Sequence, residues 1–231
     1  VEDLRRKGFL LFDTLVEHSY PHCWRCKTPL IQRATEQWFV MISELKKRLL
    51  EENEKIHWVP EWAGKKRFAD WLMGARDWVI SRQRFWGAPL PIWICENCKQ
   101  RIVIGSSSQL KAKAIELPES LDLHRQCVDK IELKCNCGGS AKRVPDIVDV
   151  WLESGIASWA CLGYPKEKRA LQLWWPADFI TEAHDQTRGW FYTQLGSGIV
   201  TFEKTPYQSV LMHGHTLDCL LYTSPSPRDR Q

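Results

Sequence analysis

The densest group of residues able to do chemistry is the run DFITEAHDQTRGWFY, residues 178–192. Phe179 and Ile180 are apolar and suit a buried strand, whereas residues 181–186 are almost all polar. Because a buried element could not satisfy so many polar groups, this run is predicted to follow the carboxyl end of a strand. Ligands of open α/β sheets bind beyond that end. The candidate ligand-binding side chains are the acidic and amide residues of the run: Glu182, Asp185 and Gln186.

Three aromatic residues follow at once, Trp190, Phe191 and Tyr192. Large rings beside polar groups often form the wall of a binding site. The alternative is an ordinary solvated loop between a strand and a helix. The residues of this run alone leave both interpretations open.

The nine cysteines suggest a second kind of site. Two tight pairs, Cys95 with Cys98 and Cys135 with Cys137, supply four thiolates, the full ligand set of a tetrahedral zinc. Short β-strands are expected at 90–94 and 101–104, an arrangement typical of a zinc ribbon. Because four protein ligands close the coordination shell, the metal is predicted to be structural.

Another pair, Cys23 and Cys26, has the same two-residue separation but no second pair nearby. It is half of a zinc site completed from upstream, a metal-free pair, or a redox motif, and no thioredoxin-like pattern surrounds it. The unpaired cysteines are expected to be small buried residues: Cys127, Cys161 and Cys219.

Several elements must position these groups. Apolar residues recur at helical spacing over 35–52 and 66–83, which predicts two amphipathic helices. After them, Arg82, Arg84 and Trp86 could contact a phosphate and a ring together. Packing at a helix end is the alternative for each of the three.

Two further strands are predicted, at 147–151 and 208–213. The first ends at Trp151, a pocket wall or a core residue, and the second is followed by Gly214 and His215. Strands that repeatedly end in polar or aromatic residues predict an α/β fold with a doubly wound sheet and one crevice.

Composition narrows the class of protein. The chain has 231 residues, 44% hydrophobic residues, 13 Trp and a net charge of +4, which fits one large or two small globular domains able to contact a polyanion. With no long apolar run and no signal peptide, a soluble, cytoplasmic protein is expected. Residues 1–20 look truncated, and the Ser/Pro/Arg-rich residues 219–231 look like a disordered or non-native tail.

Several blocks, in order, resemble the middle of the class I isoleucyl-tRNA synthetases. They are YPHCWRCKTPLI, ATEQWFV, WVISRQRFWGAPLPIW, DVWLESGIASW, FITEAHDQTRGWFY and LMHGHTLD. The similarity runs from about residue 20 to 218. Their order is more specific than any one motif.

The resemblance implies an internal fragment with an α/β fold, the second half of a Rossmann catalytic core, carrying a zinc-ribbon insertion and a helical N-terminal segment. Residues 1–22 would end the editing domain, and 23–94 would be the helical return segment. The zinc-binding insertion would span 95–144 and the core 145–218. The family's HIGH signature would lie upstream and its KMSKS loop downstream.

The resemblance also implies roles for single residues. Glu182 would bind the ribose of the aminoacyl-adenylate, and Asp185 and Gln186 the ribose and the α-amino group. Trp151 and Trp190 would enclose the isoleucine side chain. The adenine slot would lie near the residues after the last strand: Gly214, His215 and Leu217. Cys23 and Cys26 would match half of a family zinc site.

The sequence departs from the family pattern in a few places. Ala183 stands where Gly is usual, and its methyl group would lie close to the ribose. Leu152 and Glu153 replace Phe-Asp, and His215 replaces Phe. Cys135 and Cys137 are one residue closer than usual.

The implied activity is joining isoleucine to the α-phosphate of ATP, with Mg²⁺, and then transferring it to tRNA(Ile). No residue of the chain is expected to act as a nucleophile or general acid or base, because such transfers depend on positioning and electrostatics. The full-length enzyme would be a monomer, and this piece would be inactive alone. The alternatives are a valyl-tRNA synthetase fragment and a zinc-ribbon RNA-binding module without catalysis.

Overall fold

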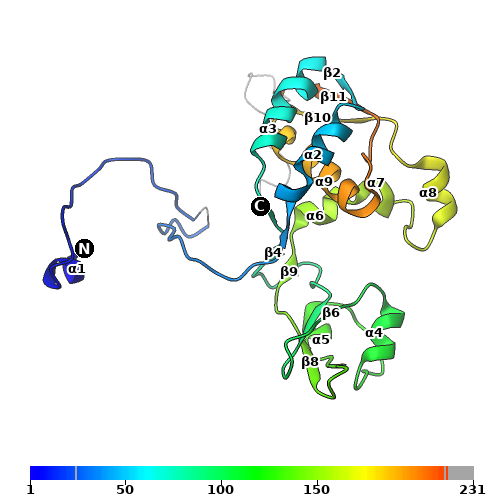
Figure 1. The fold of residues 1–231 in the computed structure, drawn as a ribbon, viewed down its shortest axis with the longest axis horizontal. Helices are drawn as coiled ribbons and strands as arrows, with labels where there is room; N and C mark the ends of the chain where they lie inside the picture. The colour runs from blue at the N-terminus through cyan, green and yellow to red at the C-terminus, as the bar shows by residue number, and fades with distance from the viewer. Residues whose placement is uncertain (24, 216, 218–231) are drawn as a thin grey trace. The chain divides into compact units, whose positions relative to one another are not determined.

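The computed structural model describes residues 1–23, 25–215 and 217. They belong to two compact units, Val1–Glu36 and Gln37–Gln231 (Figure 1). The first unit holds helix α1 (Glu2–Arg6) and a turn closed by a bridge between His22 and Pro29. No helix in the described part of the chain is long and apolar enough to cross a membrane.

A three-stranded parallel sheet organises the second unit, with strand order β10-β11-β2. The strands are β10 (Ile180–Ala183), β11 (Ser209–His213) and β2 (His57–Val59). The strand predicted at 208–213 is confirmed. The one predicted around Phe179 instead begins at Ile180 and includes Glu182, and Phe179 is 55% exposed.

One face of this sheet is covered. Ile180, Val210 and Trp58 lie in register and are buried, whereas their neighbours Val59 and Leu211 are 44% and 40% exposed. The core on the covered face is completed by α2 (Ile42–Asn53), α3 (Ala69–Gly74) and α9 (Trp190–Phe202). In the described residues the sheet is therefore wound on one side, not on the two sides that the sequence predicted.

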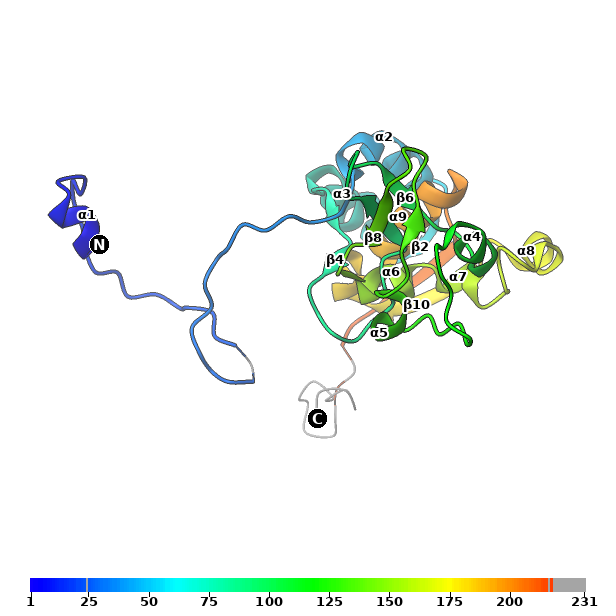
Figure 2. The same ribbon diagram turned by 90° about the horizontal axis from the view of Figure 1, so that it is seen from below.

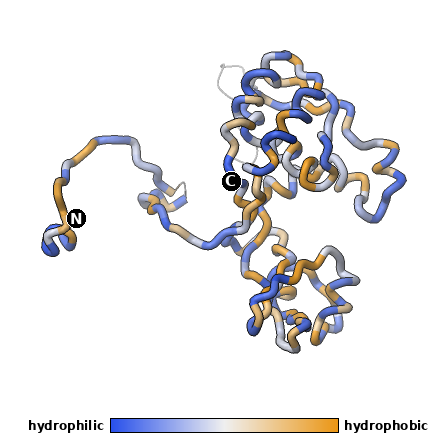
Figure 3. Tube along the Cα trace, viewed as in Figure 1, coloured by the Kyte–Doolittle hydropathy of each residue, from blue (hydrophilic) through white to orange (hydrophobic). Residues whose placement is uncertain are grey.

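Both predicted amphipathic helices are shorter than expected. Helix α2 begins at Ile42 and keeps alternating apolar and charged residues (Figure 3), and residues 35–41 lie outside it. The second prediction is met by a π-helical segment, η1 (Ala63–Phe68), and α3, which ends at Gly74. Its last part forms β3 (Trp78–Val79), paired with β1 (Phe39–Val40). Strand pairing prevails there because β1 supplies backbone partners to a β-favouring Trp-Val.

The segment predicted as a strand at 147–151 changes structure half-way. Strand β9 (Ile147–Val148) pairs antiparallel with β4 (Ser81–Arg82), outside the parallel sheet, and α6 (Val150–Gly155) follows. The buried Asp149 accepts a hydrogen bond from the Trp151 amide at 3.3 Å and so caps α6. Trp151 therefore lies in a helix, and the prediction that it ends a strand is wrong.

Arg82 binds the same carboxylate, with its Nη2 3.0 Å from Asp149 Oδ2. Its Nη1 also donates to the carbonyls of Val79 and Ser81. These contacts favour the structural interpretation of Arg82 over phosphate binding.

A separate subdomain contains a four-stranded antiparallel sheet, order β6-β5-β8-β7. Figure 2 labels two of its strands, β6 and β8. Its elements are β5 (Ile92–Cys95), β6 (Arg101–Val103), β7 (Leu133–Lys134), β8 (Ser140–Arg143), α4 (Ser107–Lys113) and α5 (Arg125–Val128). Trp93 and Leu133 lie at the centre of its own small core. The two strands expected around Cys95 and Cys98 are confirmed.

Shorter elements complete the second unit: α7 (Ala157–Ala160), α8 (Lys168–Trp174) and the 3-10 turn η2 (His184–Arg188). Helix α6 packs closely against α9. Gly155 permits this approach, since a Cβ there would lie 2.8 Å from the Thr193 carbonyl oxygen and 2.9 Å from Ser197 Oγ.

Replacing Gly155 with Ala is expected to lower the free energy of unfolding by about 1–3 kcal/mol, because the methyl group meets backbone that cannot move aside. Urea denaturation measures the change. Gly74→Ala is the control, since nothing lies within 4 Å of its Cβ position. Equal stability of the two variants would contradict this packing.

The buried carboxylate of Glu52 links α2 to the turn before β11. Glu52 is 1% exposed, accepts from the Thr205 amide at 3.0 Å, and lies 3.2 Å from Arg48 Nη2. Burial raises the pKa of Glu52, but Lys55, the Thr205 amide and Arg48 together lower it more, so the pKa is below its ordinary value. The charged form is therefore favoured by folding.

Because the folded-state pKa is the lower one, the stabilisation by Glu52 is present above the unfolded pKa of about 4.3 and is lost as pH falls through the folded pKa. Glu52→Gln is expected to cost about 1–3 kcal/mol at pH 7 and progressively less below about pH 4. Denaturation at several pH values tests this. Glu51→Gln is the control because Glu51 is exposed, and a pH-independent cost for Glu52→Gln would refute the ion-pair role.

Candidate functional site

Four cysteine sulfurs of the antiparallel subdomain lie within 4.8 Å of one another: Cys95, Cys98, Cys135 and Cys137. Cys95 Sγ is 3.5 Å from Cys137 Sγ, and Cys98 Sγ is 3.6 Å from Cys135 Sγ. Among the described residues, this is the one group of three or more His, Cys, Asp or Glu side chains that is placed to hold a metal ion. The structure thus brings together the four ligands that the sequence predicted.

Two tight turns aim these sulfurs at one point. In the first, the Lys99 amide donates to the Cys95 carbonyl at 3.1 Å, and Lys99 has φ +60°. In the second, the Gly138 amide donates to the Cys135 carbonyl at 3.0 Å, with φ +82° at Gly138. The left-handed Gly138 lets Cys135 and Cys137 converge although one residue, not two, separates them.

The electrostatics of the cluster fit a cation. Hydrogen bonds from the Cys98 and Asn97 amides lower the pKa of Cys95 to about 6, against the opposing effect of burial. The Gln100 amide lowers the pKa of Cys98, but the three neighbouring sulfurs outweigh it and raise the pKa to about 12. One thiolate is therefore stabilised by the backbone, and further thiolates repel it unless a positive ion lies between them.

The other cysteines lie outside this cluster. Cys23 and Cys26 occupy the turn of the first unit, where the Thr28 hydroxyl lowers the pKa of Cys26 to about 7. No third ligand joins them among the described residues. Cys127 is half-buried and Cys161 is exposed, so the expectation of burial is wrong for Cys161. Cys219 lies outside the described residues.

A second group of polar and aromatic residues gathers beyond the carboxyl end of β10. Gln186 Oε1 accepts from the Trp190 amide at 2.8 Å, and Gln186 Nε2 donates to Asp185 at 3.1 Å. The Trp190 indole donates to the Ser154 carbonyl at 3.1 Å, which ties α9 to α6 beside Trp151. The structure therefore assembles Gln186 and Asp185 of the 3-10 turn η2, Trp190 of α9 and Trp151 of α6, from three elements.

Gly189 is central to this group, and the sequence interpretation missed it. A Cβ there would lie 2.4 Å from Gln186 Oε1 and 3.4 Å from Trp151 Cη2. Arg67 was also missed; its Nε donates to the His184 carbonyl at 3.2 Å and to the Thr187 hydroxyl at 3.1 Å, which holds the 3-10 turn. The glycine after Arg188 could have indicated a close approach of the backbone at this position. Nothing in the sequence around Arg67 indicates its role.

Glu182 pairs with Met212 and lies on the same face of the sheet as the buried Ile180. Unlike Ile180, Glu182 is exposed. Its carboxylate makes no hydrogen bond or ion pair with a described residue, so it is available to a ligand. At the tips of the two strands the rings of His184 and His215 are 4.4 Å apart. Ala183 pairs with His213, and Gly214 and Leu217 are exposed beyond β11.

Two predicted wall residues lie elsewhere. Phe191 and Tyr192 are 0% and 7% exposed and belong to the hydrophobic core, where Phe191 packs against Trp58 of β2 and Tyr192 against Trp71 of α3. Their prediction as a binding wall is wrong because they face inward from the first turn of α9. Only Trp190, which is half-buried, remains at the surface of that turn.

A family model described as tRNA synthetases class I (I, L, M and V) matches residues 15–219, nearly the whole chain. The chain belongs to this family. The resemblance to the class I synthetases that the sequence predicted is confirmed. The mixed helix and sheet structure agrees with a class I synthetase domain.

Within the class I synthetases, the chain is 56% identical to an isoleucine–tRNA ligase of Archaeoglobus fulgidus and 57% identical to one of Methanothrix thermoacetophila, over 218 residues each. Each match covers 94% of this chain and 21% of the relative, so the chain spans about a fifth of these proteins. A solved ternary complex of Agrobacterium radiobacter agnB2 LeuRS, tRNA and LeuAMS is 24% identical, with a TM-score of 0.45 over 65% of this chain and 21% of that one.

Proposed function

We propose that this chain is part of an ATP-dependent isoleucine–tRNA ligase that activates isoleucine as an adenylate and transfers it to tRNA(Ile). The single observation that carries the proposal is the group of Gln186, Asp185, Trp190 and Trp151 that forms directly after β10, the strand that carries the free carboxylate of Glu182, at the carboxyl end of a parallel sheet. Ligands of α/β sheets bind at such an edge. The identity to named isoleucine–tRNA ligases supports the choice of reaction.

Each residue of this group has a proposed task. Glu182 would accept hydrogen bonds from the ribose hydroxyls, and Asp185 and Gln186 would hold the ribose and the α-amino group. Because Gln186 is itself held by the Trp190 amide, its position is fixed before a ligand arrives. Trp151 and Trp190 would enclose the aliphatic side chain, and Gly214, His215 and Leu217 would lie beside the adenine.

The chemistry proposed for these residues is positioning. The amino-acid carboxylate must be held in line with the α-phosphate of ATP, which enters with Mg²⁺, and correct orientation removes much of the barrier. None of the proposed residues has to act as a nucleophile or as a general acid or base.

The metal proposed for the four-cysteine cluster is Zn²⁺, held by Cys95, Cys98, Cys135 and Cys137 in a zinc-ribbon insertion. Zinc bound there would cross-link the two turns of the subdomain. Sulfur as the donor in all four positions fits zinc and leaves no position for a substrate. Cys23 and Cys26 would join an equivalent site only with ligands from outside this chain.

The proposed layout follows from these assignments. Residues 1–22 would end an editing domain, 23–94 would return the chain to the core, 95–144 would be the zinc insertion, and 145–218 the second half of a Rossmann core. The partners of the whole protein would be ATP, isoleucine and tRNA(Ile). It would act as a monomer in the cytoplasm.

A chimera tests the proposal: this chain replaces the matching fifth of the Archaeoglobus fulgidus relative, and isoleucine-dependent exchange of pyrophosphate into ATP is measured. We expect exchange with isoleucine, and about 10- to 200-fold less efficient exchange with valine, since one methylene is worth about 1–3 kcal/mol in an apolar pocket. A preference for valine would make this a valine enzyme. A folded chimera that binds tRNA but exchanges with neither amino acid would support a non-catalytic RNA-binding module instead.

A further inference from the structure

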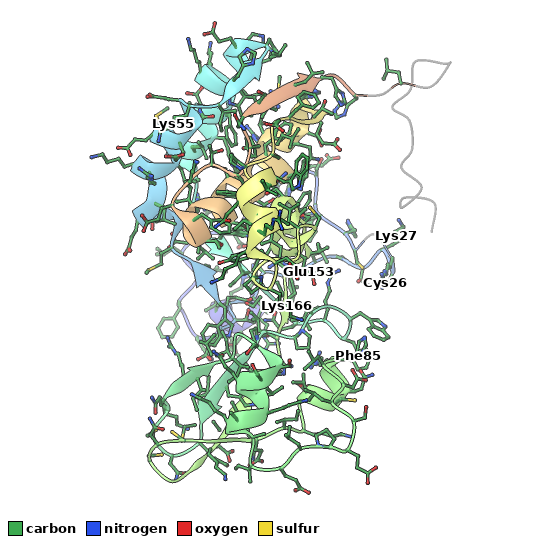
Figure 4. All side chains as sticks on the ribbon, turned by 90° about the vertical axis from the view of Figure 1, so that its right-hand side faces the viewer. Cys26, Lys27, Lys55, Phe85, Glu153 and Lys166 are labelled. Atoms are coloured by element: carbon green, nitrogen blue, oxygen red, sulfur yellow. The ribbon has the colours of Figure 1, made fainter. Side chains whose placement is uncertain are left out.

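Two adjacent aromatic residues, Phe85 and Trp86, project from the loop between β4 and the four-stranded subdomain. Their exposed fractions are 60% and 71%, and the two rings meet edge to face with centroids 5.6 Å apart. Figure 4 shows Phe85 beside the subdomain. Neither ring belongs to either hydrophobic core, and the proposed adenylate site does not use them.

The backbone holds this pair outward. Gly87 has φ +141°, and a Cβ there would lie 2.4 Å from Ile147 Cδ1, so the position requires glycine. The next residue, Ala88, accepts a hydrogen bond from the Val148 amide at 2.7 Å. The loop is thus anchored to β9 directly after Trp86, and the exposure of the rings is a built feature.

Cationic side chains flank the rings. The Arg125 guanidinium lies over the Phe85 ring at 6.0 Å, and its Nη1 donates to the Arg84 carbonyl at 2.5 Å. Asp129 holds Arg125 in place, with Asp129 Oδ2 3.3 Å from Arg125 Nε. The exposed Arg84 guanidinium forms no hydrogen bond or ion pair with any residue that the structure describes.

Trp86 also forms one wall of a groove of about 670 Å³ in the same subdomain. His124 lies across from it, with ring centroids 6.5 Å apart, and the Asp122 carboxylate accepts hydrogen bonds from the His124 amide and ring. The rest of the lining is mostly apolar, including Pro89, Leu110, Leu123 and Val128. Flat apolar faces thus lie near the Arg84 guanidinium, which has no acidic partner among the described residues, whereas Arg125 is paired with Asp129.

We propose that Phe85, Trp86, Arg84 and Arg125 form a stacking surface for unpaired nucleotides of RNA. Exposed rings accept base faces, which are flat and apolar, and the neighbouring guanidinium groups complement the phosphates that link them. A neutral or basic peptide fits less well, because the Arg84 guanidinium has no acidic partner among the described residues and favours an anion. The inference deepens the proposed function by naming where an unpaired stretch of the tRNA substrate is held.

The test uses the 231-residue chain and a short single-stranded RNA that carries 2-aminopurine, a base whose fluorescence falls on stacking. We expect quenching by the unaltered chain. Trp86→Ala should abolish the quenching and weaken binding about tenfold, whereas Trp86→Phe should restore much of both. Trp174→Ala is the matched control, since Trp174 is 67% exposed on α8, away from the loop. Arg84→Gln should lower the slope of log K against log salt by about 0.7.

Binding and quenching that survive Trp86→Ala would overturn the inference, as would the absence of RNA binding by the unaltered chain. Self-association that Trp86→Ala abolishes, without RNA binding, would assign the surface to a second copy of the chain and also overturn it. Because pyrophosphate exchange needs no RNA, the chimera decides the proposed function independently. If the chimera fails to exchange pyrophosphate while the chain still quenches 2-aminopurine, only the proposed ligase function is refuted.

Discussion

Replacing Cys98 with Ser is expected to remove the bound metal and unfold the four-stranded subdomain. The chain as purified should hold about one zinc per molecule, and the variant close to none. Structural zinc contributes about 10–16 kcal/mol in isolated finger peptides. The subdomain has a small core of its own around Trp93 and Leu133, so the loss should be smaller here, about 5 kcal/mol or more.

Metal analysis and amide hydrogen exchange measure this effect. Amides of β5, β7 and β8 should lose protection in Cys98→Ser, whereas those of the parallel sheet should keep it, because the two sheets have separate cores. Cys161→Ser is the control, since Cys161 is exposed and outside the cluster. Sub-stoichiometric zinc in the unaltered chain, or full protection in Cys98→Ser, would show that the cluster is not a structural metal site.

Replacing Glu182 with Ala should strongly weaken isoleucine activation without destabilising the fold. The carboxylate is exposed and has no partner among the described residues, so its loss should change the free energy of unfolding by less than about 0.5 kcal/mol. Hydrogen bonds from ribose hydroxyls to a charged acceptor are worth about 1.5–3 kcal/mol. The expected result is a fall of about 10- to 150-fold in kcat/KM for pyrophosphate exchange by the chimera.

Steady-state exchange kinetics with varied ATP and isoleucine measure that loss. Glu167→Ala is the control, because Glu167 is also exposed but precedes α8, away from the strand tips. Glu182→Gln should recover part of the activity, since an amide oxygen still accepts a hydrogen bond. Unchanged kinetics in Glu182→Ala would exclude a role in binding the adenylate.

The sequence predicted best where chemistry constrains spacing. Two tight cysteine pairs can serve one tetrahedral ion only if they converge, so the cluster could be predicted without knowing the strand order. The strand before His213 was equally clear because its apolar run is bounded by polar residues. In both cases the local pattern and the tertiary structure agree.

Errors arose where tertiary contacts decided between two local structures. Trp151 follows an apolar run that looked like one strand, but the Asp149 carboxylate, held by Arg82, ends the strand and caps a helix. Strand β2 was missed because its three residues, His57 to Val59, are strand only through pairing with β11. Phe191 and Tyr192 were placed in a binding wall because composition alone does not tell which side of α9 faces the sheet.

The most direct measurement is a crystal structure of the chimera with a non-hydrolysable isoleucyl-adenylate analogue. The account predicts the ribose hydroxyls within hydrogen-bonding distance of Glu182, and the isoleucine side chain between the indoles of Trp151 and Trp190. An analogue bound elsewhere, with Glu182 and Gln186 contacting only solvent, would contradict it.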